Sequence, residues 1–414
     1  MDKIDINDKS DSGAIKINLK RLEMIINQAN TVYFNKSPEK DFFQFPRAVM
    51  DIPTEKDSIV LGFYMINYEL KSDKKKATFF LKFNGAPVKE TRQISYAKSA
   101  VLTGAFAINQ SVKSTSLSVD YGSKDAGSIE ENKNQSFHFG AIQMPSGTVL
   151  KTNLSTSTTI NKSLKWTTFP NMYLRINNSK GDNQLIVIMY TISIPIKNFN
   201  ESTEFGTRFK YGNREIPDSS FVSKGLSHYS AHCAYALNVE KGTQDLLIEY
   251  KYNDDNPLTT SPSDKNQVYS LTAFYLPSTA ILENCKLDLK SKFVEGRWKK
   301  LGFKKEITIP PKREKSSVLI LYHVNLSVYK RKLSMAISIN EKRFKNNIAT
   351  SNYTERANIQ GYGVFLLKGG VYNIDLQYFL HADNGNTSKI DYDPSVGGQK
   401  SNDESISLQI ILLD

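Results

Sequence analysis

Three stretches of the chain repeat the same succession of sequence landmarks at a spacing of about 128 residues. One landmark is an apolar–polar alternation, found at Leu81-Lys82-Phe83, Phe209-Lys210-Tyr211 and Ile337-Ser338-Ile339. A second is an aliphatic-x-aliphatic-x-Tyr pattern, which ends at Tyr121, Tyr250 and Tyr378. Because both landmarks keep the same spacing, the sequence predicts one supersecondary design built three times in succession.

Other landmarks set the limits of the repeated units. Each unit has a leading aromatic (Phe42, Trp166, Trp298) and closes with an apolar run (139–145, 271–277 and 408–414). These marks predict an N-terminal extension over residues 1–23 and units over 24–147, 148–279 and 280–414. Each unit is long enough to bury its own core. Since no long linker separates them, we expect the units to pack together.

Alternating apolar residues indicate that the units are built of β-strands. The runs 59–66, 185–194 and 318–328 are rich in β-branched and aromatic residues and are bounded by polar turns. Helical periodicity is nearly absent, except over residues 15–26, which fit a short amphipathic helix or a first strand. The sequence therefore predicts an all-β fold of three tandem jelly-roll β-sandwich domains.

Two segments of the first unit resemble a known family. They are the closing run Phe137-His138-Phe139-Gly140-Ala141-Ile142-Gln143-Met144-Pro145 and the Asn84-Gly85 turn within residues 81–88. These segments are similar to the tumour-necrosis-factor-like and complement globular-head jelly rolls. The resemblance implies a ten-strand jelly roll that trimerises through one sheet face and has no catalytic residues. Three fused units would then close into an intramolecular pseudo-trimer, the alternative being a linear string.

The positive charge of the chain is concentrated in one region. The net charge is +12, and residues 297–345 hold 14 basic and 3 acidic residues. A patch of this sign would suit a protein partner with an acidic surface, such as a filament; the alternative is an ordinary solvated surface. Few aromatics are interleaved with the charges, so nucleic acid is less favoured. The predicted partner-binding residues are Lys299, Lys300, Lys304, Lys305, Lys312, Arg313, Lys330, Arg331, Lys332, Lys342, Arg343 and Lys345.

The sequence offers few residues for catalysis or metal binding. His228 and His232 would share one face of a strand and could ligate a metal, but a structural pair is the simpler interpretation. Acid-rich turns at 124–131, 253–256 and 383–393 could bind calcium or could merely be solvated loops. Phosphate-binding glycine loops and nucleophile elbows are absent. We therefore expect no enzyme activity, no catalytic residue, no cofactor and no metal.

Composition also bears on the compartment. The chain has two cysteines, Cys233 and Cys285, which cannot form a disulfide framework. No run approaches the roughly 20 apolar residues of a membrane-spanning helix, and no signal peptide is evident. These features predict an intracellular protein of a reducing compartment without membrane insertion; removal of a leader would reverse that prediction.

Three function classes follow from this reading. The first is a non-enzymatic structural or adaptor protein whose jelly-roll units bind protein partners. The second is a lectin-like carbohydrate-binding module, with Trp166, Trp298, Tyr211 and Tyr269 as stacking platforms. The third is a capsid or other component of a higher-order assembly.

Overall fold

The chain is all-β, as the alternating pattern predicts. The computed structural model describes residues 32–37, 42–53, 58–72, 75–110, 114–129, 135–144, 147–179, 184–196, 199–264, 266–287, 296–311, 315–344, 347–351, 354–381 and 404–413. Within these ranges the regular elements are strands and one short 3₁₀ helix, η1 (Lys89–Thr91). The predicted extension over residues 1–23 and the whole of the 15–26 segment lie outside them.

The first stretch of chain forms two antiparallel sheets. One has the order β1-β9-β3-β10, with β7 also paired to β3, and the other has the order β2-β8-β4-β5, with β6 also paired to β4. The strands are β1 (Val32–Phe34), β2 (Phe43–Pro53), β3 (Ser58–Leu70), β4 (Ala77–Phe83), β5 (Ala86–Pro87), β6 (Gln93–Ser95), β7 (Ser99–Gln110), β8 (Ser114–Ser123), β9 (Gly127–Ile129) and β10 (Phe137–Met144).

The second stretch repeats this arrangement. Its sheets have the orders β11-β20-β14-β17 and β13-β18-β15-β16, and a small extra sheet pairs β12 with β19. The strands are β11 (Val149–Asn153), β12 (Thr159–Ile160), β13 (Ser163–Asn178), β14 (Gln184–Pro195), β15 (Glu204–Tyr211), β16 (Arg214–Lys224), β17 (His228–Val239), β18 (Gly242–Tyr252), β19 (Leu258–Thr259) and β20 (Val268–Tyr275).

The third stretch also has two sheets. Their orders are β21-β30-β24-β28 and β22-β29-β25-β26, with β23 paired to β29 and β27 to β25. The strands are β21 (Ile281–Lys286), β22 (Lys299–Lys300), β23 (Lys305–Ile309), β24 (Ser316–Arg331), β25 (Leu333–Ile339), β26 (Lys342–Arg343), β27 (Ala349–Thr350), β28 (Thr354–Leu367), β29 (Gly370–Leu380) and β30 (Ser405–Leu413).

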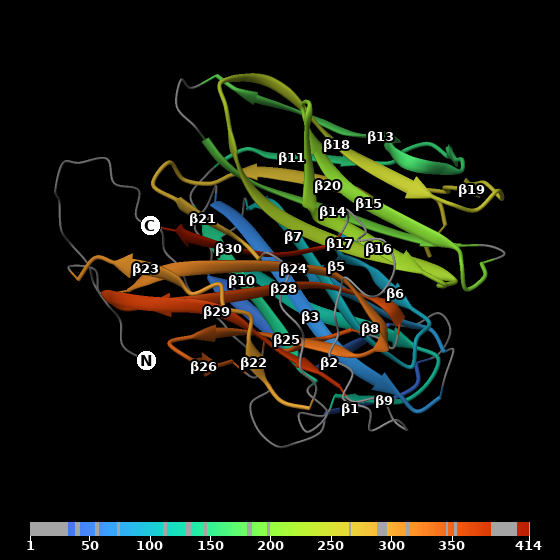
Figure 1. Cartoon of the computed structure of the whole chain (residues 1–414), viewed down its shortest axis with the longest axis horizontal. Helices are drawn as coiled ribbons and strands as arrows, with labels where there is room; N and C mark the ends of the chain where they lie inside the picture. The colour runs from blue at the N-terminus through green and yellow to red at the C-terminus, as the bar shows by residue number, and fades with distance from the viewer. Residues whose placement is uncertain are drawn as a thin grey trace.

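Each stretch therefore contains two main sheets, which we distinguish by the central strand that each one holds. We call the sheet that holds β3, β14 or β24 the inner sheet, and the sheet that holds β4, β15 or β25 the outer sheet. Within the described ranges every strand pair joins strands of the same stretch. In Figure 1 the green and yellow strands of the second stretch lie above the blue strands of the first and the orange and red strands of the third. The exact unit boundaries at 147/148 and 279/280 stay predictions.

Strands of the inner sheets are apolar on both faces. Along β3, Val60 and Tyr64 lie in the core of the first sandwich, whereas Leu61 and Phe63 lie in a different apolar cluster. Since successive side chains of a strand point to opposite faces, such a strand must be covered on both sides. The continuous apolar runs of the sequence are explained by this double burial.

The apolar cluster that contains Leu61 and Phe63 is shared by all three inner sheets. It combines buried side chains of the first, second and third stretches, such as Leu61, Val187 and Leu319, all less than 4% exposed. Three further clusters fill the individual sandwiches, although Met65 of the first stretch joins the cluster of the third. The inner sheets thus face one another across common apolar contacts.

The repeated tyrosine landmark occupies equivalent positions in the three outer sheets. Tyr121, Tyr250 and Tyr378 are 5%, 6% and 5% exposed, as expected for buried strand residues. Their partners on β4, β15 and β25 are Phe79, Thr207 and Met335, spaced 128 residues apart. The sequence repeat therefore corresponds to a repeat of strand register.

A second set of buried tyrosines also repeats. Each lies on the central strand of an inner sheet. Its hydroxyl donates to a backbone carbonyl in the segment that comes after β4, β15 or β25 in the chain. The pairs are Tyr64 to Thr91 O (2.9 Å), Tyr190 to Ser219 O (3.3 Å) and Tyr322 to Asn347 O (3.3 Å). Because buried hydroxyls need partners, these bonds fix the inner sheet against the outer one in each stretch.

The predicted Asn-Gly hairpin is confirmed. Asn84 and Gly85 join β4 to β5, and both have positive φ values, of 50° and 77°. Two successive residues in the left-handed region form the type I′ turn that favours this residue pair.

Among the described residues, no helix is long and apolar enough to cross a membrane.

Substituting Tyr121, Tyr250 and Tyr378 by alanine, one at a time, is expected to lower the free energy of unfolding by about 3–5 kcal/mol in each case. The three losses should be similar because the three rings have the same burial and register. Urea unfolding of the three variants measures the loss of free energy of unfolding in each. A silent variant among the three would contradict the structural equivalence of the outer sheets.

Candidate interaction surface

The predicted basic residues of the third stretch lie mostly around its outer sheet. Lys299 and Lys300 form β22, Lys305 begins β23, and Lys342 and Arg343 form β26. Strands β22 and β23 both pair with β29, whereas β26 lies at the opposite edge, beyond β25. The basic side chains therefore come from both edges of one sheet.

Contacts across the sheet face bring some of these groups together. Lys300 Nζ lies 2.5 Å from Glu341 Oε1, beside β26. The guanidinium carbon of Arg343 lies 4.2 Å from the centre of the Trp298 ring, next to β22. A cation over an indole is stabilised by the ring quadrupole, so Arg343 also shields one face of Trp298.

A row of rings extends this cluster toward the end of β29. Trp298 packs on Phe379 with ring centres 5.7 Å apart, and Phe379 packs on His381 at 4.8 Å. The backbone N–H of His381 donates to the carbonyl of Lys332. Burial, and then the charge of Lys332, lowers the pKa of His381 to about 4. This imidazole is therefore neutral at pH 7, and the charge of the surface comes from lysine and arginine.

Other predicted basic residues have different placements. Lys304 is exposed just before β23, and Lys305 pairs with Glu283 at 2.8 Å. Arg331 is only 8% exposed. Three predicted residues and one predicted side chain fall outside the described part of the chain: Lys312, Arg313, Lys345 and the side chain of Lys330. We name the described set Trp298, Lys299, Lys300, Lys304, Lys342 and Arg343 the basic–aromatic surface.

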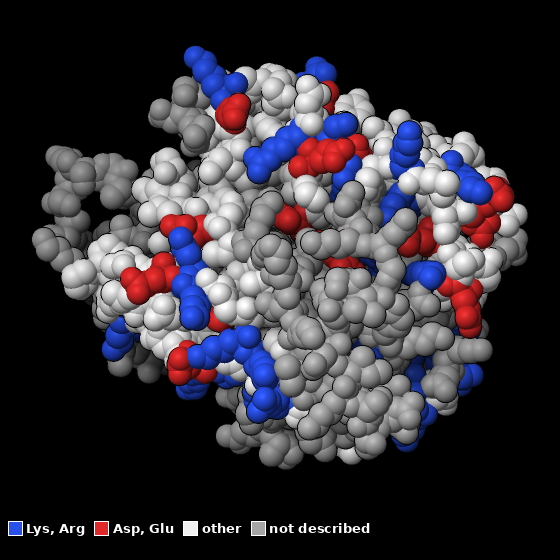
Figure 2. Space-filling model, in the orientation of Figure 1, with Lys and Arg blue, Asp and Glu red and all other residues white. Residues whose placement is uncertain are grey.

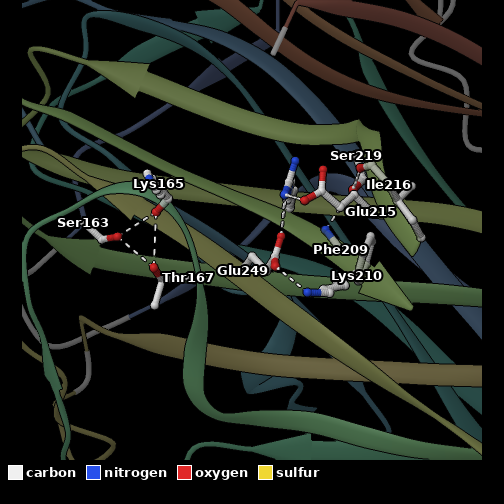
Figure 3. Close-up of polar contacts among 10 residues, drawn as sticks. Ser163, Lys165, Thr167, Phe209, Lys210, Glu215, Ile216, Ser219 and Glu249 are labelled. Carbon is white, nitrogen blue, oxygen red and sulfur yellow. Dashed lines mark hydrogen bonds and ion pairs between the residues drawn. The ribbon is translucent and has the colours of Figure 1, made fainter. Parts of the chain in front are cut away.

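The outer sheet of the second stretch has a similar cluster at the equivalent position. Arg208 stacks over Trp166 at 4.5 Å, and Lys251 lies 5.4 Å from the same ring. Arg208 also pairs with Glu249 at 2.7 Å and with Glu215 at 2.8 Å. In Figure 3 a dashed line joins Glu249 to Lys210, whose Nζ lies 3.3 Å from Glu249 Oε1. In this cluster the positive charges are matched by carboxylates.

The first stretch completes the series with a phenylalanine. The guanidinium of Arg92 lies 5.4 Å from the ring of Phe42 and 5.2 Å from that of Phe80. Phe42, Trp166 and Trp298 are the leading aromatics of the three units, so each outer sheet presents a ring with an arginine over it. Sequence reasoning missed this pairing, although the aligned aromatics were the available signal.

A polar pair repeats beside these rings. Lys82 pairs with Asp120 at 2.6 Å, Lys210 with Glu249 at 3.3 Å, and Gln377 Nε2 donates to Ser338 Oγ at 3.2 Å. These residues belong to the two landmarks from which the repeat was recognised. The third pair is uncharged, so the basic groups of the third stretch have fewer carboxylate neighbours at this position.

Charge on the face drawn in Figure 2 is less one-sided than the sequence count suggests. Figure 2 shows lysine and arginine interspersed with aspartate and glutamate over the visible face. Exposed pairs such as Lys162 with Asp255 contribute to this mixing. On this face the basic groups are therefore mixed with acidic ones.

Two of the predicted stacking platforms are buried. Tyr211 and Tyr269 are 8% and 6% exposed and belong to the core of the second sandwich. The prediction that they could stack on a sugar is wrong, because alternation places both rings on the inward face of their strands. Trp166 and Trp298 are half-buried at the surface.

The two histidines of β17 each hydrogen-bond a side chain of β14. His228 Nε2 hydrogen-bonds Ser193 Oγ at 2.9 Å, and His232 Nδ1 hydrogen-bonds Thr191 Oγ1 at 2.9 Å while its other nitrogen contacts the hydroxyl of Tyr362. Burial lowers the pKa of both rings to about 3. Cys233 is buried and Cys285 half-buried, and both are free thiols.

In the acidic turns that fall in the described part, the aspartates accept hydrogen bonds from nearby backbone N–H groups. Asp125 accepts from the N–H groups of Ser72 (2.7 Å) and Ala126 (2.9 Å), and Asp254 accepts from that of Asn256 (2.9 Å). Hydrogen bonds hold the pKa of both carboxyls below the usual value, the largest contribution coming from the side chain of Ser72 for Asp125 and from the N–H of Asn256 for Asp254. Within the described ranges no three His, Cys, Asp or Glu side chains gather as a metal site would require. The third turn, 383–393, lies outside those ranges.

The fold and surface define an all-β protein of packed β-sandwiches with repeated cation–aromatic clusters on its outer sheets. No known protein family and no curated protein matches the sequence. The chain aligns with PNGase F, a glycosylasparaginase from Flavobacterium meningosepticum, at 13% identity and TM-score 0.30, covering 64% of this chain and 96% of that one.

Two further solved structures align more weakly. The lipid-containing bacteriophage PM2 gives 10% identity and TM-score 0.14 over 92% of this chain and 99% of that chain. The tandem CBM22-1-CBM22-2 domain of Paenibacillus barcinonensis Xyn10C gives 8% identity and TM-score 0.18, over 64% and 93%. With TM-scores this low, the description of this chain rests on its own sheets and contacts.

Proposed function

We propose that this chain is a non-enzymatic structural or adaptor protein whose three jelly-roll units form an intramolecular pseudo-trimer and bind protein partners through their outer sheets. The observation that carries the proposal is the apolar cluster shared by the three inner sheets. The inner sheets pack against one another, so their shared faces are covered. The outer sheets and their loops are therefore the surfaces left for a partner.

Polar contacts between the stretches support a fixed arrangement. Asn67 Nδ2 donates to Ile348 O at 2.8 Å and links the first stretch to the third. Gln409 bonds both the N–H and the carbonyl of Ala236, at 2.8 and 2.7 Å, and links the third to the second. Buried bonds of this kind specify one orientation, whereas apolar contacts alone would tolerate sliding. Assembly through one sheet face is also what the tumour-necrosis-factor-like resemblance implies.

The basic–aromatic surface is the partner-binding region that we propose. Lys300, Lys304 and Lys342 are exposed there. An acidic protein surface, such as a repeating assembly or filament, would complement these charges and would be steered toward them during association. Aromatic and arginine residues are also the side chains most often responsible for binding energy in interfaces.

Charge reversal tests this proposal. Affinity capture from the native source, followed by reconstitution with the purified partner, should give a stoichiometric complex with the unmodified chain. The Lys300→Glu/Lys342→Glu variant is expected to bind at least about tenfold more weakly, because two favourable charges become repulsive. The matched control is Lys71→Glu/Lys241→Glu, which changes two exposed lysines elsewhere and should bind normally.

The opposite results are equally specific. Equal loss of binding in both variants would show that net charge, and not this surface, governs the interaction. Unchanged binding in both would remove the basic–aromatic surface from the proposal. Failure to capture any stoichiometric partner would count against the adaptor function as a whole.

Carbohydrate binding is a second candidate because Trp166 and Trp298 lie half-buried on outer sheets. Arginine covers one face of each ring, so a sugar would have to stack on the other face. Glycan-array binding that disappears in Trp166→Ala or Trp298→Ala would favour this candidate. Array binding by neither the unmodified chain nor its variants would leave the adaptor proposal alone.

A further inference from the structure

Histidine is concentrated on the faces by which the inner sheets meet, which we call the junction faces. On β17, Ala234 belongs to the apolar cluster that the inner sheets share. Since side chains two residues apart in a strand point to the same face, His228 and His232 lie on this junction face too. On β24, Leu321 belongs to the shared cluster, so His323 lies on the junction face of the third stretch. Three of the chain's five histidines are therefore placed between the stretches.

Each of these three rings meets an aromatic ring of another stretch. The pairs, with the distances between ring centres, are His228 with Tyr96 of the first stretch (5.7 Å), His232 with Tyr362 of the third (5.8 Å) and His323 with Phe221 of the second (6.2 Å). All three imidazoles are less than 7% exposed. The rings are thus part of closed contacts between stretches, and a charge on any of them would be shielded from water.

The ring of His232 bridges the second and third stretches by hydrogen bonds. Its Nδ1 bonds Thr191 Oγ1 at 2.9 Å, and its Nε2 bonds the hydroxyl of Tyr362. A neutral imidazole has one donor and one acceptor nitrogen, so one of the two hydroxyls donates to the ring. Protonation makes both nitrogens donors. One buried hydroxyl then loses its acceptor while the ring gains a charge, and burial alone lowers the pKa of His232 to about 3.

Ionisable groups of all three stretches surround His228 or line the pocket that it lines. They are Tyr96 and Lys76 of the first stretch, Lys224 and Asp264 of the second, and Arg356 of the third. The Nε2 atom of His228 bonds the uncharged Ser193 Oγ at 2.9 Å. Burial lowers the pKa of this ring to about 3, with a further lowering by Lys76 that Asp264 opposes. The balance of these groups keeps the ring neutral in the closed junction.

The surroundings of His323 have the same effect. Its neighbours in register are Gln360 on β28 and Ser407 on β30, both uncharged. From β16 of the second stretch, Phe221 packs against the ring. Burial lowers the pKa of His323 to about 3, although a hydrogen bond with the backbone of Asp218 acts in the opposite direction. This ring is also neutral as long as the stretches are in contact.

The other two histidines do not place imidazole in the core of a sandwich either. His138 alternates along β10 with Phe137 and Phe139, which belong to the core of the first sandwich, so its side chain points away from that core. His381 follows β29 in an outer sheet and packs on Phe379. Imidazole titration therefore acts mainly between the stretches, and each sandwich has an apolar cluster of its own.

We propose that the junction is an acid-sensitive device, in which proton uptake by His228, His232 and His323 opens the contacts between the stretches while each sandwich keeps its core. The inference rests on the pseudo-trimer of the proposed function. In the open form the rings regain water and a pKa near 6.5, so the open form takes up protons that the closed form excludes as the pH falls. Opening is therefore favoured below about pH 6.

Small-angle X-ray scattering of the full chain between pH 7.5 and pH 4.5, at constant ionic strength, tests the inference. At pH 7.5 we expect the radius of gyration of a compact chain of 414 residues, about 22 Å. Toward pH 5 this radius should rise, while far-ultraviolet circular dichroism keeps its β-sheet signal. An extended chain already at pH 7.5 would contradict the pseudo-trimer. A chain that stays compact down to pH 4.5 would contradict the acid-sensitive junction and leave the pseudo-trimer intact.

Glutamine variants locate the effect, because glutamine forms hydrogen bonds and takes up no proton. The His228→Gln/His232→Gln/His323→Gln variant should open at a pH at least about one unit below that of the unmodified chain. The matched control is His381→Gln, which removes the imidazole of an outer sheet and should open at the unmodified pH.

Single variants keep the test decisive if the triple variant is already expanded at pH 7.5. Each of His228→Gln, His232→Gln and His323→Gln should then lower the opening pH by about a third as much. Equal opening pH values for the junction variants and the His381→Gln control would overturn the proposal. Loss of the circular dichroism signal at the same pH as the expansion would also overturn it, because acid would then unfold the sandwiches themselves.

Discussion

Replacing Leu319 by aspartate is expected to unfold all three stretches together. Leu319 lies on β24, is 1% exposed, and belongs to the apolar cluster that the inner sheets share. Its neighbours in register are Val364 on β28 and Ile411 on β30, both in the same cluster. The substitution therefore affects the packing between stretches and leaves the core of the third sandwich unaltered in composition.

The expected loss of stability is large. Removing a buried leucine side chain costs about 2–5 kcal/mol, and burying an unpaired carboxylate adds several kcal/mol more. The sum approaches the net stability of a typical folded protein, about 5–15 kcal/mol. If the three inner sheets depend on one another, this loss must appear in the second stretch as well as in the third.

Tryptophan fluorescence can separate the stretches. The chain has two tryptophans, Trp166 in the second stretch and Trp298 in the third. In a Trp298→Phe background, the emission of Trp166 reports on the second stretch alone. We expect Leu319→Asp to lower the urea midpoint seen by Trp166, although the substitution lies in another stretch.

An exposed leucine provides the matched control. Leu164 on β13 is 73% exposed, so Leu164→Asp should change the free energy of unfolding by no more than about 0.5 kcal/mol and leave the urea midpoint nearly unchanged. Trp166 keeping its original midpoint in the Leu319→Asp protein would show that the stretches unfold independently. The shared cluster would then be a contact without energetic consequence, and the pseudo-trimer proposal would lose its basis.

The repeat was readable from the sequence because strand register leaves a periodic trace. Tyr121, Tyr250 and Tyr378 recur at a nearly constant spacing since each must fill the same position between two sheets. Insertions collect in loops and do not disturb that spacing. All-β class, strand-rich units and the Asn84-Gly85 hairpin followed from the same local rules.

The shared cluster could not be predicted in the same way. Runs such as Leu185–Ile194 show that both faces of a strand are covered, but a covered face does not identify its partner. The partner is decided by contacts between residues more than a hundred positions apart, such as those of Leu61, Val187 and Leu319. A single sequence contains no signal for them.

Charge was the least predictable feature. Counting basic residues from 297 to 345 suggested one patch, yet Lys300 pairs with Glu341 and Arg343 covers Trp298. Such contacts depend on which strands become neighbours in the outer sheet.

Acidification is expected to destabilise the fold steeply between about pH 6 and pH 4. His228, His232 and His323 are each less than 7% exposed, and burial lowers the pKa of all three to about 3. In the unfolded chain the same rings have a pKa near 6.5. As the pH falls below 6.5 the unfolded state takes up protons that the folded state cannot accept, so the stabilisation present above that pH is lost progressively toward pH 3.

The surroundings of the three rings fix the direction of the effect. His232 is held between Thr191 and Tyr362, which are uncharged. His228 is opposed by the charge of Lys76, with a weaker compensating influence of Asp264. No described carboxylate is close enough to outweigh burial at any of the three, and each proton contributes about 1.4 kcal/mol per pH unit. With His381, whose pKa is lowered by burial to about 4, four such rings give a slope of about 5.5 kcal/mol per pH unit.

Urea unfolding at a series of pH values between 7 and 4 measures this slope. In a His228→Gln/His323→Gln variant, two of the four protons are removed, so the histidine part of the slope should fall by about half. Comparing slopes, with each protein referenced to its own stability at pH 8, separates titration from any packing change that the substitutions cause. An unchanged slope would assign acid unfolding to carboxylates; a reduced slope would show that the buried imidazoles, two of them on the strand that meets the third stretch through Tyr362, set the acid limit of the folded chain.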